Sequence, residues 1–324
     1  MKKYLLLSFA VFFFSAAGFT EEDLPIKTLE EHTNGVYSVS YSPDGKYIAS
    51  GSWDNTLKIW RLSNFQCIKT LEGHTNIVTK VSYSPDGKYL ASGSGDNTIK
   101  IWRLNDSQCI KTLEGHTLGV NSVTYSPDGK YLASGSEDTT IKIWRLSDFK
   151  CIKTLEGHTS GVVSVTYSPD GKYLSSGSGD TTIKIWQTTD FKCIKTLKGY
   201  SSGVMSVSYS PDGKYLASSG SDDTKIKIWR LSDFQCIKTL EGHTGDVLSV
   251  SYSPDGKYLA SGSGDNTIKI WRLSDSQCIK TLEGHTSIVV SVSYSPDGKY
   301  LASGSGDNTI KIWLASGKQK EQKE

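Results

Sequence analysis

Short segments in which apolar and polar positions alternate recur along the whole chain. In one unit they cover residues 77–83, 89–92, 98–102 and 109–113. They are rich in Val, Ile, Thr and Tyr, and they have the period of two that a β-strand requires. A Ser-Pro-Asp-Gly turn at 84–87 separates the first two, because Pro fixes φ and Gly accepts a positive φ. No segment keeps a long helical period, so the pattern predicts an all-β protein.

The four-strand unit is repeated seven times. The Ile-Trp pair that closes its third strand recurs every 42 residues, with one interval of 43, and ends at Trp60, Trp102, Trp144, Trp186, Trp229, Trp271 and Trp313. A single four-stranded sheet with apolar residues on both faces cannot bury them by itself. Copies of the sheet must cover one another, and a ring leaves no sheet uncovered. The repeat therefore predicts a β-propeller.

Four short motifs carry a resemblance to a known family. Gly-His stands near the start of five units, and Ser-Pro-Asp-Gly, Ser-Gly-Ser-x-Asp and the closing Ile-Trp occur in all seven. Together they resemble the WD40-repeat family across the whole repeat array. The Asp that usually follows the Trp is absent, and Arg, Gln or Leu stands there instead. The resemblance implies a seven-bladed β-propeller of four-stranded antiparallel blades.

The last unit lacks a fourth strand of its own, since it stops at Trp313. Residues 25–30 match residues 67–72, the fourth strand of the first unit. We therefore expect the N-terminal strand to complete the last blade, which also removes an exposed sheet edge. This assigns residues 24–314 to the propeller and leaves 315–324 as a charged tail that we expect to be disordered.

In WD40 proteins the Gly-His histidine joins a hydrogen-bond network with a Ser, the turn Asp and the Trp. The matching positions are His32, Ser50, Asp54, Trp60, His74, Ser92, Asp96, Trp102, His116, Ser134, Asp138, Trp144, His158, Ser176, Asp180, Trp186, His243, Ser261, Asp265, Trp271, His285, Ser303, Asp307 and Trp313. The alternative, metal binding, is disfavoured because each histidine belongs to a different blade. The fifth unit has Tyr200 in place of the His and one extra residue; Ser218 or Ser219 takes the Ser role there.

Six cysteines occupy one equivalent position in the fourth strand: Cys67, Cys109, Cys151, Cys193, Cys236 and Cys278. An even number of cysteines in an exported protein favours disulfides. Packed sheets lie about 10 Å apart, however, and a disulfide needs Cα atoms within about 7 Å. We expect reduced, partly buried thiols.

The first residues differ from the repeats. Two lysines precede an apolar run and then small residues, which is the pattern of a cleaved signal peptide at 1–18. The run is shorter than the ~20 residues of a spanning helix. This predicts a secreted or periplasmic protein with no membrane span after cleavage; an uncleaved anchor is the alternative. We expect a monomer.

Charge argues against nucleic-acid binding. Without Lys2 and Lys3 the 36 basic residues become 34, which equals the 34 acidic ones. A neutral surface attracts phosphates only weakly. No phosphate-binding loop, no Cys-x-x-Cys and no paired carboxylates at a plausible cleft are found, so we expect no catalytic residue, cofactor or metal.

Positions that differ between near-identical repeats are candidates for partner recognition. In the family, partners usually bind the narrow face formed by the first loop and the second hairpin turn. The variable positions that match it are Tyr37, Trp53, Thr79, Asn121, Glu137, Val163, Met205, Asp222, Leu248 and Val290. They combine aromatic, acidic and apolar residues, which suits a peptide with an apolar anchor and a basic residue.

We therefore expect a non-catalytic scaffold that binds a protein or peptide partner and is exported from the cytoplasm. One alternative is a structural, envelope-associated module without a defined ligand, and another is a propeller enzyme or lectin with a site in the central channel. For the variable positions themselves, the alternative is drift at solvent-exposed sites. The ring of variable positions holds only two acids and no histidine, which argues against an enzyme.

Overall fold

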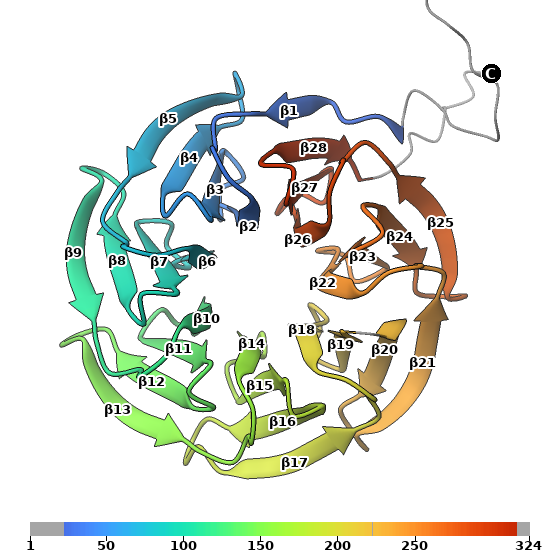
Figure 1. Cartoon of the computed structure of the whole chain (residues 1–324). Helices are drawn as coiled ribbons and strands as arrows, with labels where there is room; N and C mark the ends of the chain where they lie inside the picture. Colours follow the sequence, from blue (N-terminus) through green and yellow to red (C-terminus); the bar gives the residue numbers. More distant parts are fainter. Residues whose placement is uncertain (1–22, 222, 316–324) are drawn as a thin grey trace, which may run out of the picture.

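The computed structural model describes residues 23–221 and 223–315, which form seven antiparallel sheets of four strands arranged in a ring (Figure 1). The N-terminal segment 1–18 and nearly all of the tail 315–324 lie outside the described residues. In each blade the strands are given in order from the innermost, beside the channel, to the outermost. They are β2 (Val36–Tyr41), β3 (Tyr47–Ser52), β4 (Leu57–Arg61) and β5 (Gln66–Leu71) in blade 1; β6 (Val78–Tyr83), β7 (Tyr89–Ser94), β8 (Ile99–Arg103) and β9 (Gln108–Leu113) in blade 2; β10 (Val120–Tyr125), β11 (Tyr131–Ser136), β12 (Ile141–Arg145) and β13 (Lys150–Leu155) in blade 3; β14 (Val162–Tyr167), β15 (Tyr173–Ser178), β16 (Thr182–Gln187) and β17 (Cys193–Lys198) in blade 4; β18 (Val204–Tyr209), β19 (Tyr215–Gly220), β20 (Asp223–Arg230) and β21 (Gln235–Glu241) in blade 5; β22 (Val247–Tyr252), β23 (Tyr258–Ser263), β24 (Ile268–Arg272) and β25 (Gln277–Leu282) in blade 6; and β26 (Val289–Tyr294), β27 (Tyr300–Ser305), β28 (Ile310–Leu314) and β1 (Lys27–Leu29) in blade 7.

Blade 7 joins the two ends of the described chain, as the sequence predicts. β1 pairs antiparallel with β28, with Thr28 opposite Lys311 and Leu29 opposite Ile310. The Lys311 ammonium donates to Thr28 Oγ1 at 3.0 Å. Leu29 is only 3% exposed, so this short outer strand also contributes to the core. The expected all-β, seven-bladed propeller with an N-terminal closing strand is confirmed.

The core consists of seven equivalent clusters, each between two neighbouring blades. One cluster joins Ala49, Leu57 and Leu71 of blade 1 to Val78 and Trp102 of blade 2, among others. The inner ends of the blades approach closely. At Gly51 an added Cβ would stand 2.6 Å from Val78 Cγ1, so glycine is required there by the neighbouring blade. Each blade is therefore buried only by its neighbours, which is why the sheets form a closed ring.

The Ser-Pro-Asp-Gly turns are held by their own side chains. Ser84 Oγ accepts the Tyr89 N–H at 2.9 Å and donates to Asp86 Oδ1 at 2.6 Å. Gly87 has a φ of 69°, in the left-handed region, and its N–H donates to the Ser84 carbonyl at 2.9 Å. The turn thus fixes the register between the inner strand and the second strand of the blade.

Candidate partner-binding face

Two loops from each blade meet on one face of the ring: the loop that enters the inner strand and the turn between the second and third strands. The Trp53 N–H donates to the Gly35 carbonyl at 2.9 Å, and the Glu137 N–H donates to the Gly119 carbonyl at 2.9 Å. Blades 2, 4, 6 and 7 form the same backbone bond. These bonds hold the variable residues of the two loops beside one another, and we call this surface the narrow face.

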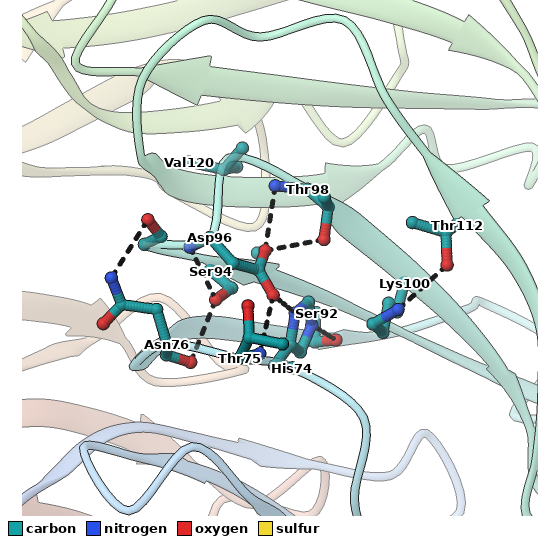
Figure 2. A network of polar contacts seen from close by, with 12 residues as sticks. His74, Thr75, Asn76, Ser92, Ser94, Asp96, Thr98, Lys100, Thr112 and Val120 are labelled. Atoms are coloured by element: carbon teal, nitrogen blue, oxygen red, sulfur yellow. Dashed lines mark hydrogen bonds and ion pairs between the residues drawn. The ribbon is translucent and has the colours of Figure 1, made fainter.

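A side-chain network fastens the same two loops to the sheet (Figure 2). In blade 2, Trp102 Nε1 donates to Ser92 Oγ at 2.8 Å, and Ser92 Oγ lies 2.7 Å from His74 Nε2. His74 Nδ1 lies 2.7 Å from Asp96 Oδ2. Because a carboxylate only accepts, a neutral imidazole carries its proton on Nδ1, and Nε2 accepts the serine hydroxyl proton. Every member then has a suitable partner.

The network is the same in six blades. All six histidines lie 2.7–2.8 Å from both the turn Asp and the Ser. Burial alone would raise the pKa of Asp138, but hydrogen bonds from Thr140, from the Thr117 N–H and from His116 lower it to about 2. Burial lowers the pKa of His116 despite its bond to Asp138. In blade 3 a deprotonated Asp138 beside a neutral His116 is thus the favoured state.

Blade 5 keeps part of the network. The hydroxyls of Tyr200 and Ser218 lie 2.7 Å apart, and Trp229 Nε1 donates to Ser218 Oγ at 2.7 Å. Ser218 therefore takes the Ser role. The turn Asp223 lies outside this network, and its Oδ1 accepts the Lys225 N–H at 3.2 Å. An added Cβ at residue 220 would stand 2.7 Å from the Tyr200 ring, so the glycine there makes room for the larger side chain.

The variable inner positions all fall on the second residue of an inner strand, and all are partly exposed. They are Tyr37, Thr79, Asn121, Val163, Met205, Leu248 and Val290. The predicted apolar arc is thereby placed on consecutive blades, 4 to 7, along the rim of the channel. Ile288 extends this arc on blade 7, since 38% of its surface is exposed.

An aromatic pair occupies the blade 1 side of the narrow face. The Tyr37 and Trp53 rings are stacked, with centroids 4.9 Å apart and an angle of 16° between their planes. Trp53 remains 44% exposed, whereas Tyr37 is half-buried and burial raises the pKa of its hydroxyl. The pair therefore presents a flat apolar surface on the narrow face.

The polar members of the predicted site differ in what they can offer a partner. The Thr79 hydroxyl faces two carbonyl groups, that of Val120 at 2.5 Å and that of Gly93 at 3.0 Å, and Asn121 Nδ2 donates to the Val162 carbonyl at 3.3 Å. Glu137 is exposed. Asp222 lies outside the described residues; in blade 5 it is the Ser221 N–H that makes the loop-to-turn bond, to the Gly203 carbonyl at 2.8 Å. Only Glu137 among these four is free to present a charge on the described surface.

One residue beside the site escaped the sequence analysis. Lys80 lies on the inner strand β6, next to Thr79, where the six other inner strands have serine. Comparing the repeats at every strand position, and not only in the loops, would have found it.

The cysteines require a correction. All six are free, as expected, but five of them are exposed and only Cys67 is half-buried. The prediction of partial burial is wrong for those five because no further strand or blade covers the outer edge of each sheet. The Cys67 Sγ–H donates to the Lys69 carbonyl at 3.4 Å.

Within residues 23–221 and 223–315, no group of three or more His, Cys, Asp or Glu side chains is arranged to hold a metal ion. No helix in the described ranges has the length and apolar character needed to cross a bilayer.

Comparison with known proteins identifies the family. The WD40 family, described as WD domain, G-beta repeat, matches residues 24–61, 65–103, 107–145, 149–187, 191–230, 234–272 and 276–313. These segments cover nearly all of the propeller, and the chain belongs to the WD40-repeat family.

Curated relatives match over single repeats. The small ribosomal subunit protein RACK1 of Trypanosoma brucei brucei is 43% identical over 44 residues, 14% of each chain. The target of rapamycin complex subunit wat1 of Schizosaccharomyces pombe is 42% identical over 41 residues, 13% of each chain. Protein HIR1 of Kluyveromyces lactis is 48% identical over 46 residues, 13% of this chain and 5% of the relative. The chain thus aligns with a small part of each relative's length.

The predicted secreted or periplasmic location is wrong. The relatives are named as components of the small ribosomal subunit, of a target of rapamycin complex and of the THO complex, and the ribosome is an intracellular particle. The prediction depended on segment 1–18 alone, whose apolar run is compatible with other roles, and that segment lies outside the described residues.

Proposed function

We propose that this WD40 propeller is a non-catalytic scaffold that binds a protein partner on its narrow face. Relatives named as subunits of larger assemblies support a role in protein interaction. The observation that carries the choice of face is the stacked pair of Tyr37 and Trp53, of which Trp53 is 44% exposed. Exposed, ordered aromatic residues are frequent energetic centres of protein interfaces.

The partner segment that fits this face combines an apolar anchor with a basic residue. The aromatic pair and the apolar arc of Val163, Met205, Leu248 and Val290 provide apolar contacts around the rim. Glu137, two blades away from the aromatic pair, provides an exposed negative charge. Since the loops are held by the hydrogen-bond network, little ordering is needed on binding, and that favours affinity.

The test is selection of binding peptides from a displayed random library against the propeller. Selected peptides are expected to carry an apolar and a basic residue, and Trp53→Ala should weaken their binding by about tenfold or more, as loss of an interface centre does. Glu137→Ala should weaken binding most for the basic peptides.

The matched control is Tyr300→Ala, which removes an aromatic residue of similar exposure, 38%, beside the turn at the opposite end of the inner strands. It should leave binding unchanged. Equal loss in Trp53→Ala and Tyr300→Ala, or selected peptides that bind all three variants as well as the wild type, would remove the narrow face from consideration.

A further inference from the structure

The seven inner strands surround the central channel (Figure 1). Together they carry a single charged residue. That residue is Lys80; the seven strands contain no Asp, Glu, His or Arg. The register that Lys80 occupies belongs to serine in the other blades: Ser38, Ser122, Ser164, Ser206, Ser249 and Ser291.

These six serines join neighbouring inner strands. Each Oγ accepts the backbone N–H of a valine on the next blade at 3.1–3.2 Å. Ser38, for example, accepts the Val81 N–H. The bond is missing between blades 2 and 3, because an ammonium group has no lone pair to offer. The Val123 N–H, which corresponds to the six donors, has no side-chain acceptor among the described residues.

Lys80 itself lacks a partner. Its ammonium group makes no hydrogen bond or ion pair with any residue in the described ranges, although the side chain is only partly exposed. The strands packed against β6 are β2, β3, β7 and β10, and none of them carries an acidic or basic residue. Burial lowers the pKa of Lys80. An ammonium group in such surroundings is unfavourable until an anion compensates it.

We propose that the central channel contains an oxyanion site in which the Lys80 ammonium and the Val123 N–H donate to the same ligand. The Lys80 ammonium has no partner and the Val123 N–H has no side-chain acceptor among the described residues. Lys80 also occupies the register whose side chain meets the equivalent valine N–H in the six other interfaces. A carboxylate or a phosphate group has the lone pairs that these donors require. The site is independent of the narrow face.

The proposal is tested with inorganic phosphate as the probe, by following the Val123 amide and the Lys80 side chain in nuclear magnetic resonance spectra of the whole chain. Both signals are expected to shift and saturate as phosphate is added. Lys80→Ser restores the residue of the six other blades and should therefore fold. In this variant the response to phosphate should weaken by about tenfold or more, because a charge-assisted bond is lost.

Lys88→Ser is the matched control, since Lys88 is an exposed lysine on the turn that follows β6 and lies 3.7 Å from Asp86. It should bind phosphate as the wild type does. A second titration with acetate distinguishes the two kinds of ligand. Saturation at lower acetate concentration indicates a site for carboxylates, and saturation at lower phosphate concentration indicates a site for phosphate groups. Equal responses of the wild type and Lys80→Ser to both anions, or none in either, would overturn the proposal.

Discussion

Seven equivalent tyrosines end the inner strands, and their hydroxyl groups differ in one blade. Six of these hydroxyls are buried without a hydrogen-bond partner among the described residues: those of Tyr41, Tyr83, Tyr125, Tyr167, Tyr252 and Tyr294. The seventh, Tyr209, accepts a hydrogen bond from Ser175 of the preceding blade. The other blades have alanine at the position of Ser175. Burying a hydroxyl without a partner costs free energy.

A serine at an equivalent alanine should therefore stabilise the fold. Ala91 and Tyr125 share one core cluster, as Ser175 and Tyr209 do across their own interface. We expect Ala91→Ser to raise the free energy of unfolding by about 1 kcal/mol and Ser175→Ala to lower it by about 1–3 kcal/mol. Urea denaturation measures both.

The control is Tyr125→Phe, which removes the unpaired hydroxyl. In that background Ala91→Ser should lose its benefit. The idea fails when Ala91→Ser destabilises the protein equally with Tyr125 and with Phe at that position.

At this scale the sequence predicts repeated contacts and misses single departures. The network of His74, Ser92, Asp96 and Trp102 was predictable because the same four residue types recur at the same spacing. The effect of Ser175 and of Lys80 on the structure depends on the residue that each faces across a blade interface. That residue belongs to another repeat. A comparison of repeats shows that such a position is unusual, but not what it contacts.

At the scale of the element, the pairing of the outer strand β1 with β28 closes the ring. The sequence of β1 could be matched to the fourth strand of blade 1, so the pairing with β28 was predictable before any geometry was known. The structure adds the burial of Leu29 and the bond between Thr28 and Lys311. It also shows that only three residues of the matched segment 25–30 form regular β-structure, Lys27–Leu29.

Deleting residues 24–31 should destabilise the whole ring. The loss includes the buried Leu29 and the pairing along β28, and it exposes a sheet edge. We expect the free energy of unfolding to fall by more than about 3 kcal/mol, measured by chemical denaturation. Lys27→Ala, which removes an exposed side chain of the same strand, should change stability by less than about 0.5 kcal/mol. An unchanged melting temperature after the deletion would contradict the role of this strand.

The loops of the narrow face were harder to predict than the strands. The variable positions were found by comparing repeats. The comparison could not tell which side chains are exposed and which are hydrogen-bonded to the propeller itself. Thr79 and Asn121 use their donors on carbonyls of the scaffold. The stacking of Tyr37 on Trp53 brings together residues from two different loops, and it depends on the backbone bond that joins those loops.

At the scale of the whole molecule, equivalent groups in several blades titrate together. Burial lowers the pKa of His116, His158, His243 and His285, and bonds to the turn Asp oppose this only in part. Their pKa in the unfolded chain is about 6.5. Below that pH the unfolded state binds more protons than the folded state, so acid favours unfolding.

Stability should therefore be greatest above about pH 6.5 and should fall as the pH drops from there towards 5. A second fall is expected below about pH 4, where unfolded aspartates take up protons while Asp138, Asp180 and Asp265 keep a pKa of about 2 in the folded state. Melting temperatures across this range measure both steps. His116→Gln should reduce the first slope; a flat profile between pH 7 and 5 would contradict the buried neutral histidines.

The pairing of β1 with β28 places the beginning and the end of the propeller in one blade. A circle assembled from equivalent sheets has no intrinsic origin. Linking these neighbouring ends with a short peptide and cutting the chain in any other interblade loop gives a circular permutant with the same set of contacts. The order in which the blades are synthesised is thus separable from the shape that they form.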